Sequence, residues 1–436
     1  MCSVHSIGEH LRSLLSAANM ELCSCLFGSE GSSRVGSMTY KNSFARYGII
    51  GDAGSFQKHL NRFSTDAGLP ISDAHYRKEK SNCSGPVYAV RSLRGHMHHV
   101  NATCWSMTDP SLLVSVGKDG KLFTWDVALP RQVSQVSLAN DMPMSCSISP
   151  SNSLVAWGGL GATGHILKRN VESGEVTETD VATLSDHEGY IAGCAFLSDA
   201  QLLTGSGDST CKVFDVNTAT TLRTFTHSSD TLAVVARRTT QAEISAQEFF
   251  SASDNTLCHW DMRQGSSTAP SQRIVLDRKE DITSLSVCPG NEYLVACGTN
   301  SGDCWVYDIR ADTNKCVIGC VGEDITQEVS SVALSYTGDY LFVGYRSWVK
   351  RYMDCVLTVF DTSGRHTVED TTSNNVPMAP HCVIGDNSGI TSTVPFSYSF
   401  QNCTGKFISS VQLNCDGCAL AVGSHDCAVT VFRQQR

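Results

Sequence analysis

Short apolar runs alternate with polar turn residues through most of the chain. Over residues 112–116, apolar positions alternate in a way that predicts a half-buried strand. The turn residues at 117–120 are Gly-Lys-Asp-Gly, and the apolar run that follows predicts a second strand ending at Asp126. The pattern therefore favours short antiparallel strands joined by tight turns.

The segment 93–126 recurs along the chain as a repeat. Most copies end in an aromatic residue followed by aspartate, and the last copy ends in an aromatic residue alone. These endings are Trp125-Asp126, Phe214-Asp215, Trp260-Asp261, Tyr307-Asp308, Phe360-Asp361 and Phe432. The interval before Phe214 is about twice as long as the two that follow it, so we expect a further unit over residues 137–169.

The repeats resemble WD repeats, and seven of them predict an all-β fold, a seven-bladed WD-repeat β-propeller. Intervals of about 40–45 residues are typical of four-stranded blades. We expect the strand at 87–92 to pair with the blade that ends at Phe432, because this pairing closes the ring and removes exposed sheet edges. Two longer intervals indicate insertions near residues 346–354 and 365–398, which we expect to be surface loops.

The residues before the repeats have a different pattern. Residues 5–26 predict an amphipathic helix, closed by Gly28, with an apolar stripe at Leu11, Leu15, Ala18 and Leu22. The stripe covers about two heptads, so a coiled coil with a partner and a helix docked on the chain's own propeller both stay open. We expect residues 1–27 to form this helix, 28–86 a partly disordered linker or insertion, and 87–436 the propeller.

Composition narrows the function classes. The formal net charge of −10 argues against a general nucleic-acid binder, which needs clustered Lys and Arg. The 20 cysteines are scattered through strand-like runs and are expected to be core residues in a reducing cytoplasm. No long apolar stretch or secretory signal is present in the sequence.

Polar residues in the repeats suggest either a structural network or a hydrolase. Two sets combine a histidine, a hydroxyl and an aspartate: His96, Ser115 and Asp119 with Trp125, and His187, Thr204 and Asp208. Since the set recurs by repeat, we favour buried hydrogen-bonded networks over a catalytic triad. Cys415 and Cys418 have a metal-type spacing without a second pair. We therefore predict no catalytic residue, cofactor or metal site, and no enzyme.

The amino-acid sequence between the recurring positions of the repeats resembles that of the β subunit of heterotrimeric G proteins. The matching runs are Leu93-Arg94-Gly95-His96, residues 112–115, residues 119–122 with Trp125-Asp126, residues 187–197, residues 203–211 and residues 307–312. The match continues in register to about Phe432 and is more specific than the Gly-His and Trp-Asp pairs that WD proteins share. The chain is similar to a diverged member of this family.

The resemblance implies a non-enzymatic signalling scaffold. One propeller face would bind a GDP-bound α subunit and, after its release, effector proteins. The N-terminal helix would pair with a small prenylated γ subunit, although the residues alone leave that partner open. The protein would then be cytoplasmic and peripheral at the inner face of the plasma membrane, reaching the membrane only through its partners.

The resemblance also implies positions on the partner-binding face. Kept positions are Lys121, Leu160, Tyr190, Asp230 and Asp281, and apolar character is retained at Met97, Met144 and Leu232. The family has large aromatic residues where this chain has Met142 and His425, a tyrosine at Asn101 and a lysine at His99. Interfaces depend on a few aromatic and Arg anchors. The alternative is therefore a diverged WD adaptor in a complex unrelated to G proteins.

Overall fold

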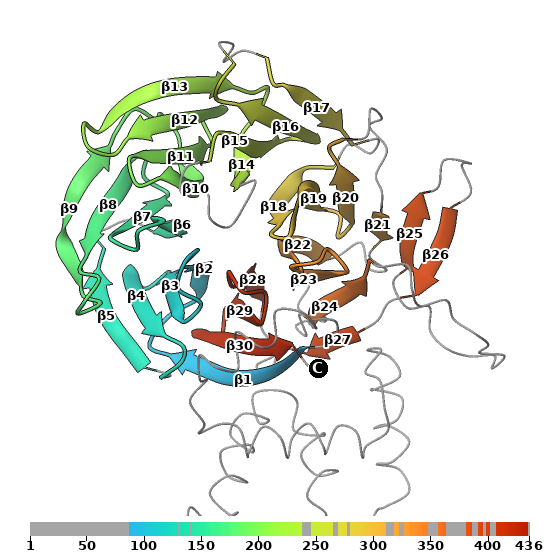
Figure 1. Cartoon of the computed structure of the whole chain (residues 1–436), viewed down its shortest axis with the longest axis horizontal. Helices are drawn as coiled ribbons and strands as arrows, with labels where there is room; N and C mark the ends of the chain where they lie inside the picture. Colours follow the sequence, from blue (N-terminus) through green and yellow to red (C-terminus); the bar gives the residue numbers. More distant parts are fainter. Residues whose placement is uncertain are drawn as a thin grey trace, which may run out of the picture.

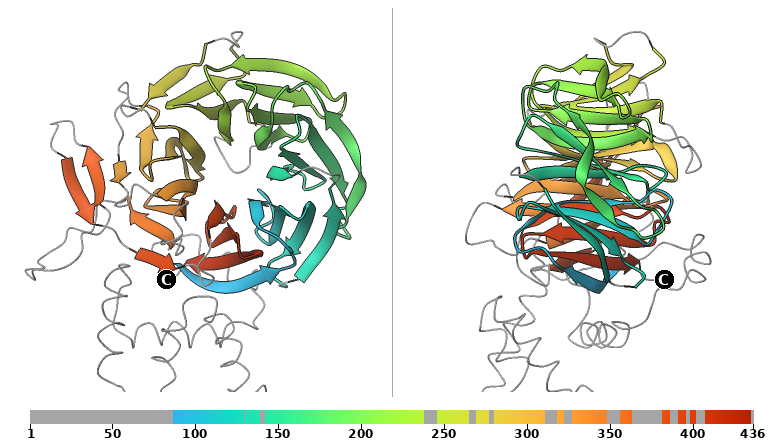
Figure 2. Two further views of the ribbon diagram at one scale, coloured as in Figure 1. Left: turned by 180° about the vertical axis from the view of Figure 1, so that it is seen from behind. Right: turned by 90° about the vertical axis from the view of Figure 1, so that its left-hand side faces the viewer.

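The structure is a computed structural model of the chain. It describes residues 87–129, 131–138, 142–237, 246–264, 269–276, 280–310, 318–321, 327–347, 356–362, 381–385, 391–395, 398–401 and 407–434. The expected helix at 5–26 and the linker at 28–86 lie outside these residues. Seven antiparallel sheets form a ring (Figure 1), and the ring is a flat disc when seen from the side (Figure 2). The predicted all-β, seven-bladed propeller is confirmed, and the described part of the chain contains no helix.

Each of the first four blades is a sheet of four consecutive strands. Blade 1 contains β2 (Val100–Trp105), β3 (Leu112–Gly117), β4 (Lys121–Asp126) and β5 (Arg131–Ser137). Blade 2 contains β6 (Pro143–Ile148), β7 (Leu154–Gly159), β8 (Gly164–Arg169) and β9 (Val176–Leu184). Blade 3 contains β10 (Ile191–Ser198), β11 (Gln201–Ser206), β12 (Thr210–Asp215) and β13 (Thr220–Thr226). Blade 4 contains β14 (Thr231–Arg237), β15 (Glu248–Ser253), β16 (Thr256–Asp261) and β17 (Gln272–Val275).

The last three blades depart from this simple order. Blade 5 contains β18 (Ile282–Cys288), β19 (Asn291–Thr299), β20 (Cys304–Asp308) and β21 (Ile318–Val321). Blade 6 contains β22 (Gln327–Leu334), β23 (Tyr340–Ser347), β24 (Val356–Asp361) and β27 (Tyr398–Gln401). Blade 7 contains β28 (Ile408–Leu413), β29 (Ala419–Ser424), β30 (Ala428–Gln434) and β1 (Val87–Arg94).

Blade 7 joins the two ends of the propeller. The strand β1 pairs antiparallel with β30, from Val87 opposite Gln434 to Arg94 opposite Ala428. The predicted closure is confirmed. Because β1 comes from the beginning of the repeats and β28–β30 from their end, this ladder holds the ring shut.

The insertion between β24 and β27 is not only a surface loop. It contains β25 (His381–Gly385) and β26 (Thr391–Pro395), which extend blade 5 outward from β21 (Figure 1). In this ladder Ile318 lies opposite Ile384 and Val321 opposite His381. The loop prediction for 365–398 was therefore wrong at these strands. An outer strand presents unpaired N–H and C=O groups, and β25 pairs with those of β21. The insertion near 346–354 lies largely outside the described residues.

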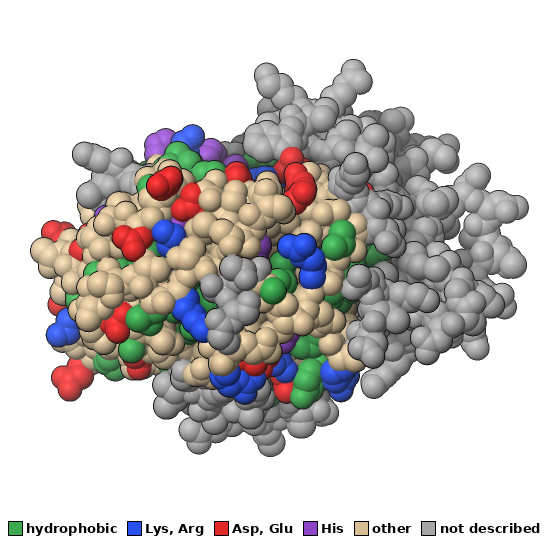
Figure 3. All heavy atoms as spheres, turned by 90° about the horizontal axis from the view of Figure 1, so that it is seen from above, with side chains coloured by type: hydrophobic (Ala, Val, Ile, Leu, Met, Phe, Trp, Pro, Cys, Tyr) green, Lys and Arg blue, Asp and Glu red, His purple; other side chains and the backbone are tan. Residues whose placement is uncertain are grey.

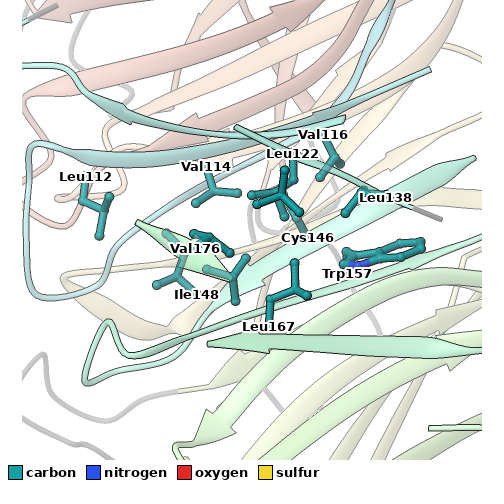
Figure 4. Packing of buried hydrophobic residues seen from close by; sticks show 12 residues of the cluster. Leu112, Val114, Val116, Leu122, Leu138, Cys146, Ile148, Trp157, Leu167 and Val176 are labelled. Atoms are coloured by element: carbon teal, nitrogen blue, oxygen red, sulfur yellow. The ribbon is translucent and has the colours of Figure 1, made fainter. Parts of the chain in front are cut away.

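The core lies between neighbouring blades. Blade 1 and blade 2 pack through an apolar cluster that includes Val114, Leu122, Ile148 and Trp157 (Figure 4). Every position of β3 is buried, so the expectation of a half-buried strand was wrong. The physical reason is that an inner strand of a propeller blade has a neighbouring blade on each side. Side chains on both faces of the strand therefore leave water.

Candidate partner-binding face

The chain direction within the blades defines two faces of the disc. Each innermost strand begins at one face, and the turn between the second and third strands returns to it. In blade 1, for example, Val100 at the beginning of β2 pairs with Gly117, which in turn pairs with Lys121. We call this the start face, and the opposite side of the disc the end face.

All the residues predicted for the partner-binding face of the propeller lie at the start face, whereas the predicted γ-binding positions in the N-terminal helix lie outside the described residues. Each of the start-face residues lies at or just before the beginning of an innermost strand, or beside a turn between second and third strands. Blade 1 holds Met97, His99, Asn101 and Lys121, blade 2 holds Met142, Met144 and Leu160, blade 3 holds Tyr190, blade 4 holds Asp230 and Leu232, blade 5 holds Asp281, and blade 7 holds His425. The ring therefore collects positions from six blades on one surface.

Two of these residues expose apolar side chains. Met97 is 74% exposed and Leu160 is 54% exposed. The other start-face positions are half-buried. The described rim carries scattered charged side chains of both signs together with apolar ones (Figure 3), and the outer strands also expose Val181, Leu222 and Val275. A partner that covers this face would bury the exposed methionine and leucine, and their removal from water would favour binding.

Several start-face residues connect neighbouring blades. The Tyr190 hydroxyl donates to Asp230 Oδ2 at 2.9 Å across blades 3 and 4, and Asn101 Nδ2 donates to the Pro143 carbonyl at 2.7 Å across blades 1 and 2. Burial and the neighbouring Asp230 raise the pKa of Tyr190 to about 12, so its hydroxyl stays protonated and continues to donate. These three side chains therefore hold neighbouring blades together, and they also form part of the start face.

The junction of blades 1 and 7 contains a histidine pair. The rings of His99 and His425 stack with centroids 4.1 Å apart and planes 24° apart, and Phe407 packs edge-on against His425 at 5.1 Å. The Nδ1 of His99 also hydrogen-bonds the carbonyl of His425 at 2.8 Å. The imidazole at 425 therefore lies in an aromatic cluster, at the position where the resemblance implies tryptophan.

Asp281 in blade 5 lies against its neighbours. Asn300 Nδ2 donates to Asp281 Oδ2 at 3.1 Å, and the Asp281 N–H donates to Asn300 Oδ1 at 3.2 Å. Burial, together with the adjacent Asp254, raises the pKa of Asp281 above its usual range. The two carboxyls lie at the junction of blades 4 and 5 at the start face, where the Ile282 N–H donates to the Asp254 carbonyl at 2.8 Å.

The polar repeat residues of blade 1 form a continuous chain of hydrogen bonds. Trp125 Nε1 donates to Ser115 Oγ at 2.8 Å, and Ser115 Oγ lies 2.9 Å from His96 Nε2. His96 Nδ1 lies 3.0 Å from Asp119 Oδ1, and Asp119 also accepts the Met97 N–H at 2.8 Å. All these groups are occupied by one another, as a structural network requires.

Blade 3 repeats this arrangement with two changes. His187 Nδ1 lies 2.7 Å from Asp208 Oδ2, and His187 Nε2 lies 2.7 Å from Thr204 Oγ1. Burial would raise the pKa of Asp208, but hydrogen bonds from Thr210, His187 and the Glu188 backbone outweigh it and lower the pKa to about 2. Phe214 replaces the tryptophan, so no indole N–H joins this network.

A third network, in blade 4, was missed by the sequence analysis. Trp260 Nε1 donates to Ser251 Oγ at 2.8 Å, and His227 Nε2 lies 3.2 Å from the same oxygen. The signal was Thr226-His227 at the position of Gly-His, followed at the repeat spacing by Trp260. Asn255 takes the place of the aspartate and donates to the Leu276 carbonyl instead, which hid the pattern.

Within the described residues, no group of three or more His, Cys, Asp or Glu side chains could hold a metal ion. Also among those residues, we find no helix with both the length and the apolar character needed to span a membrane.

The matches of this chain to known proteins include β subunits of guanine nucleotide-binding proteins. The family described as "WD domain, G-beta repeat" matches residues 88–126 and 178–215. A guanine nucleotide-binding protein subunit beta of Solanum tuberosum is 29% identical over 391 residues, covering 86% of this chain and 91% of that protein. The Arabidopsis thaliana protein of the same name is 29% identical over 304 residues, covering 67% and 77%. The subunit beta-1 of Nicotiana tabacum is 30% identical over 272 residues, covering 60% and 70%.

Proposed function

The chain belongs to the family of guanine nucleotide-binding protein β subunits, and on that premise we propose that its start face binds a GDP-bound G-protein α subunit. Release of the α subunit would expose the same face to effector proteins. The proposed chemistry is surface complementarity, without bond-making or cofactor. Holding the GDP form requires that the α subunit bind more tightly in that nucleotide state than in the other.

One observation carries the proposal. The positions that the family resemblance singled out come from six blades and lie on one face, where Met97 and Leu160 expose apolar side chains. Association would remove these side chains from water. This burial contributes a favourable free energy of about 25 cal/mol for each Å² of apolar surface buried. The half-buried polar positions around them would supply orientation and specificity.

Leu160→Asp is the variant that tests this surface. Leu160 is 54% exposed, so the change should leave folding intact while placing a charge in the proposed interface. We expect at least a tenfold loss of affinity for a GDP-loaded α subunit from the same cell, measured by calorimetry with the full chain.

Val181→Asp is the matched control. Val181 is 55% exposed but lies on the outer strand β9, away from the start face, and its replacement should leave α-subunit affinity unchanged. Equal losses in both variants would show that the start face has no special role. Equal affinity of the wild type for GDP-bound and GTP-bound α subunits would contradict the proposed mechanism.

Family membership also supports pairing of the predicted helix, through Leu11, Leu15, Ala18 and Leu22, with a small prenylated γ subunit. The γ lipid would hold the protein at the inner face of the plasma membrane. Gentle affinity purification of the full chain, followed by mass analysis, should recover a stoichiometric prenylated chain. Loss of that chain from a Leu15→Asp variant would assign the contact to the helix, and its retention would remove the helix from the contact.

A second candidate function is a WD adaptor for a complex unrelated to G proteins. The β25–β26 hairpin favours it, because it extends blade 5 beyond the four strands of an ordinary blade. Met142 and His425 favour it too, since they stand where the resemblance implies aromatic anchors. Purification of partners without any guanine-nucleotide-binding subunit would support this function over the first.

A further inference from the structure

A small pocket opens at the end face, between blades 1 and 2. Its volume is about 150 Å³. Blade 1 contributes Trp125, Arg131 and Val133, and blade 2 contributes Arg169 with residues 171–174. The pocket therefore lies on the opposite side of the disc from the start face, and nothing in the proposed function uses it.

Arg169 is the unusual group in this pocket. It is the last residue of β8 and is only 8% exposed. Its Nη1 donates to the Asn152 carbonyl at 3.1 Å, while its Nε is buried without a hydrogen-bond partner. A Cβ at Gly174 would lie 3.5 Å from Nη2, so this nitrogen lies beside the glycine that lines the pocket.

Arg169 also has no ion pair with any described residue. Burial lowers its pKa, and the negative charge of Asp109 offsets only part of that effect. The Asp109 carboxylate is itself engaged, because its Oδ1 accepts the N–H of Ser111 at 2.9 Å and the Ser111 hydroxyl at 2.7 Å. A guanidinium shielded from water in this way is left with donors that no acceptor occupies.

Arg237 shows how the same fold treats a comparable arginine. It is 7% exposed, ends the strand β14 at the end face, and lies at the junction of blades 4 and 5. Its Nη1 forms an ion pair with Glu248, and its Nε donates to the Glu292 carbonyl at 3.1 Å. Blade 2 provides no such carboxylate for Arg169, and a pocket occupies the adjacent space.

We propose that the pocket binds a carboxylate side chain of a partner peptide, held by Arg169 and Arg131. Guanidinium groups recognise carboxylates through paired, charge-assisted hydrogen bonds. Val171 lines the pocket and is 56% exposed, so it is available to pack against an apolar residue that flanks the carboxylate in the peptide.

The charges around the pocket select a carboxylate rather than a phosphate. Asp109, Asp126 and Glu172 also line it, so three acidic side chains stand against two arginines. A dianion would meet more repulsion from this set than a single carboxylate does. The occupant is therefore an acidic peptide with aliphatic neighbours, and a phosphopeptide serves as the contrasting probe.

The test observes the Arg169 Nε–H directly in the full chain labelled with ¹⁵N-arginine. The probe is acetyl-Leu-Glu-Leu-amide, and the controls are the same peptide with glutamine or with phosphoserine in the central position. We expect a saturable shift of the Arg169 resonance with the glutamate peptide, and at least tenfold weaker binding of the glutamine peptide. Equal binding of the two, or no saturable shift at millimolar peptide, would overturn the proposal. Tighter binding of the phosphoserine peptide would overturn the choice of carboxylate.

Two variants locate the effect. Arg169→Met removes an unpaired buried charge and should fold, because apolar replacement of a buried ion costs little stability; it should abolish glutamate-peptide binding. Arg310→Lys is the matched control, since Arg310 lies at the same face but is paired with Asp308 at 2.5 Å. Binding that survives Arg169→Met would overturn the site, and the peptide comparison on the wild type stands whether or not that variant folds.

Discussion

At the scale of single residues, the direction of the hydrogen bonds inside the blades follows from which groups can donate and which can accept. The indole of Trp125 only donates and the carboxylate of Asp119 only accepts, so the chain between them has one direction. Ser115 donates to His96 Nε2, and His96 Nδ1–H donates to Asp119. This direction needs a neutral imidazole, and burial lowers the pKa of His96 accordingly.

His227 predicts how stability depends on pH. It lacks the aspartate partner of the other networks, and burial, with the nearby positive charge of Arg273, lowers its pKa to about 4 from an ordinary 6.5. Between those values the unfolded chain binds more protons than the folded one. This contribution to stability is therefore complete above about pH 6.5 and is lost as the pH falls toward 4. The total loss is about 3 kcal/mol.

Replacement of this histidine tests the assignment. His227→Gln stays neutral, so the unfolding free energy from urea denaturation should fall less steeply between pH 6.5 and 4.5 than it does in the wild type. His98→Gln, at an exposed position, is the control and should keep the wild-type slope. An unchanged slope in His227→Gln would show that His227 does not titrate abnormally in the folded protein.

At the scale of elements, each strand's surroundings depend on its place in the blade. β3 has every position buried, whereas most positions of the outer strands β5, β9 and β13 are exposed or half-buried. The closing strand β1 belongs to an outer position, yet Leu93 within it is 4% exposed and packs in the cluster that contains Trp105, Phe123 and Val429. The strand that shuts the ring is therefore anchored by side-chain packing as well as by its ladder.

Leu93→Ala should weaken this closure. Removing a buried leucine side chain leaves a cavity and costs about 2–5 kcal/mol. We expect a lower urea midpoint and faster unfolding, because the ladder of β1 on β30 joins the two ends of the propeller. Arg94→Ala, at the exposed neighbouring position, should change neither quantity. Equal effects of the two changes would mean that Leu93 does not anchor the closure.

At the scale of the whole molecule, ring closure decides which residues become neighbours. His99 and His425 are 326 positions apart in sequence and stack at the junction of blades 1 and 7. The ring also collects the start-face residues of six blades on one surface, and the packing of blade 1 against blade 2 forms the pocket of Arg169 on the other. If both proposals hold, the disc has two separate binding surfaces, and the family relationship concerns only the start face.

Restoring aromatic residues on the start face distinguishes the two candidate functions. The variant carries both Met142→Trp and His425→Trp. The backbone carbonyl of residue 142 accepts the Leu160 N–H at 3.1 Å, and that of residue 425 hydrogen-bonds His99 Nδ1 at 2.8 Å. Because both bonds involve only the backbone of the substituted residue, the variant can keep them. If the face binds an α subunit through a weakened interface, affinity should rise tenfold or more, since an aromatic anchor contributes about 2 kcal/mol or more. Unchanged affinity, measured by calorimetry, would favour the adaptor that uses another surface.

Local pattern determined much of this protein. The strand alternation, the turn residues and the recurring aromatic-Asp endings were enough to predict the seven blades, the unit between Trp125 and Phe214 that lacks its ending, and the closure near Phe432. These signals are local or periodic, and antiparallel blades joined by short turns leave few ways to arrange them. The start-face positions were identified by their sequence resemblance to the β-subunit family, and their role in binding stays a prediction.

Only the tertiary structure decided the remaining features, because each depends on contacts between segments that no local pattern relates. Burial of β3 on both faces requires neighbouring blades, and pairing of β25 with β21 requires an insertion from blade 6 to reach blade 5. Likewise, the sequence shows that Arg169 is an arginine near the end of a strand. That it is buried without a carboxylate, beside a pocket, follows from how blades 1 and 2 meet.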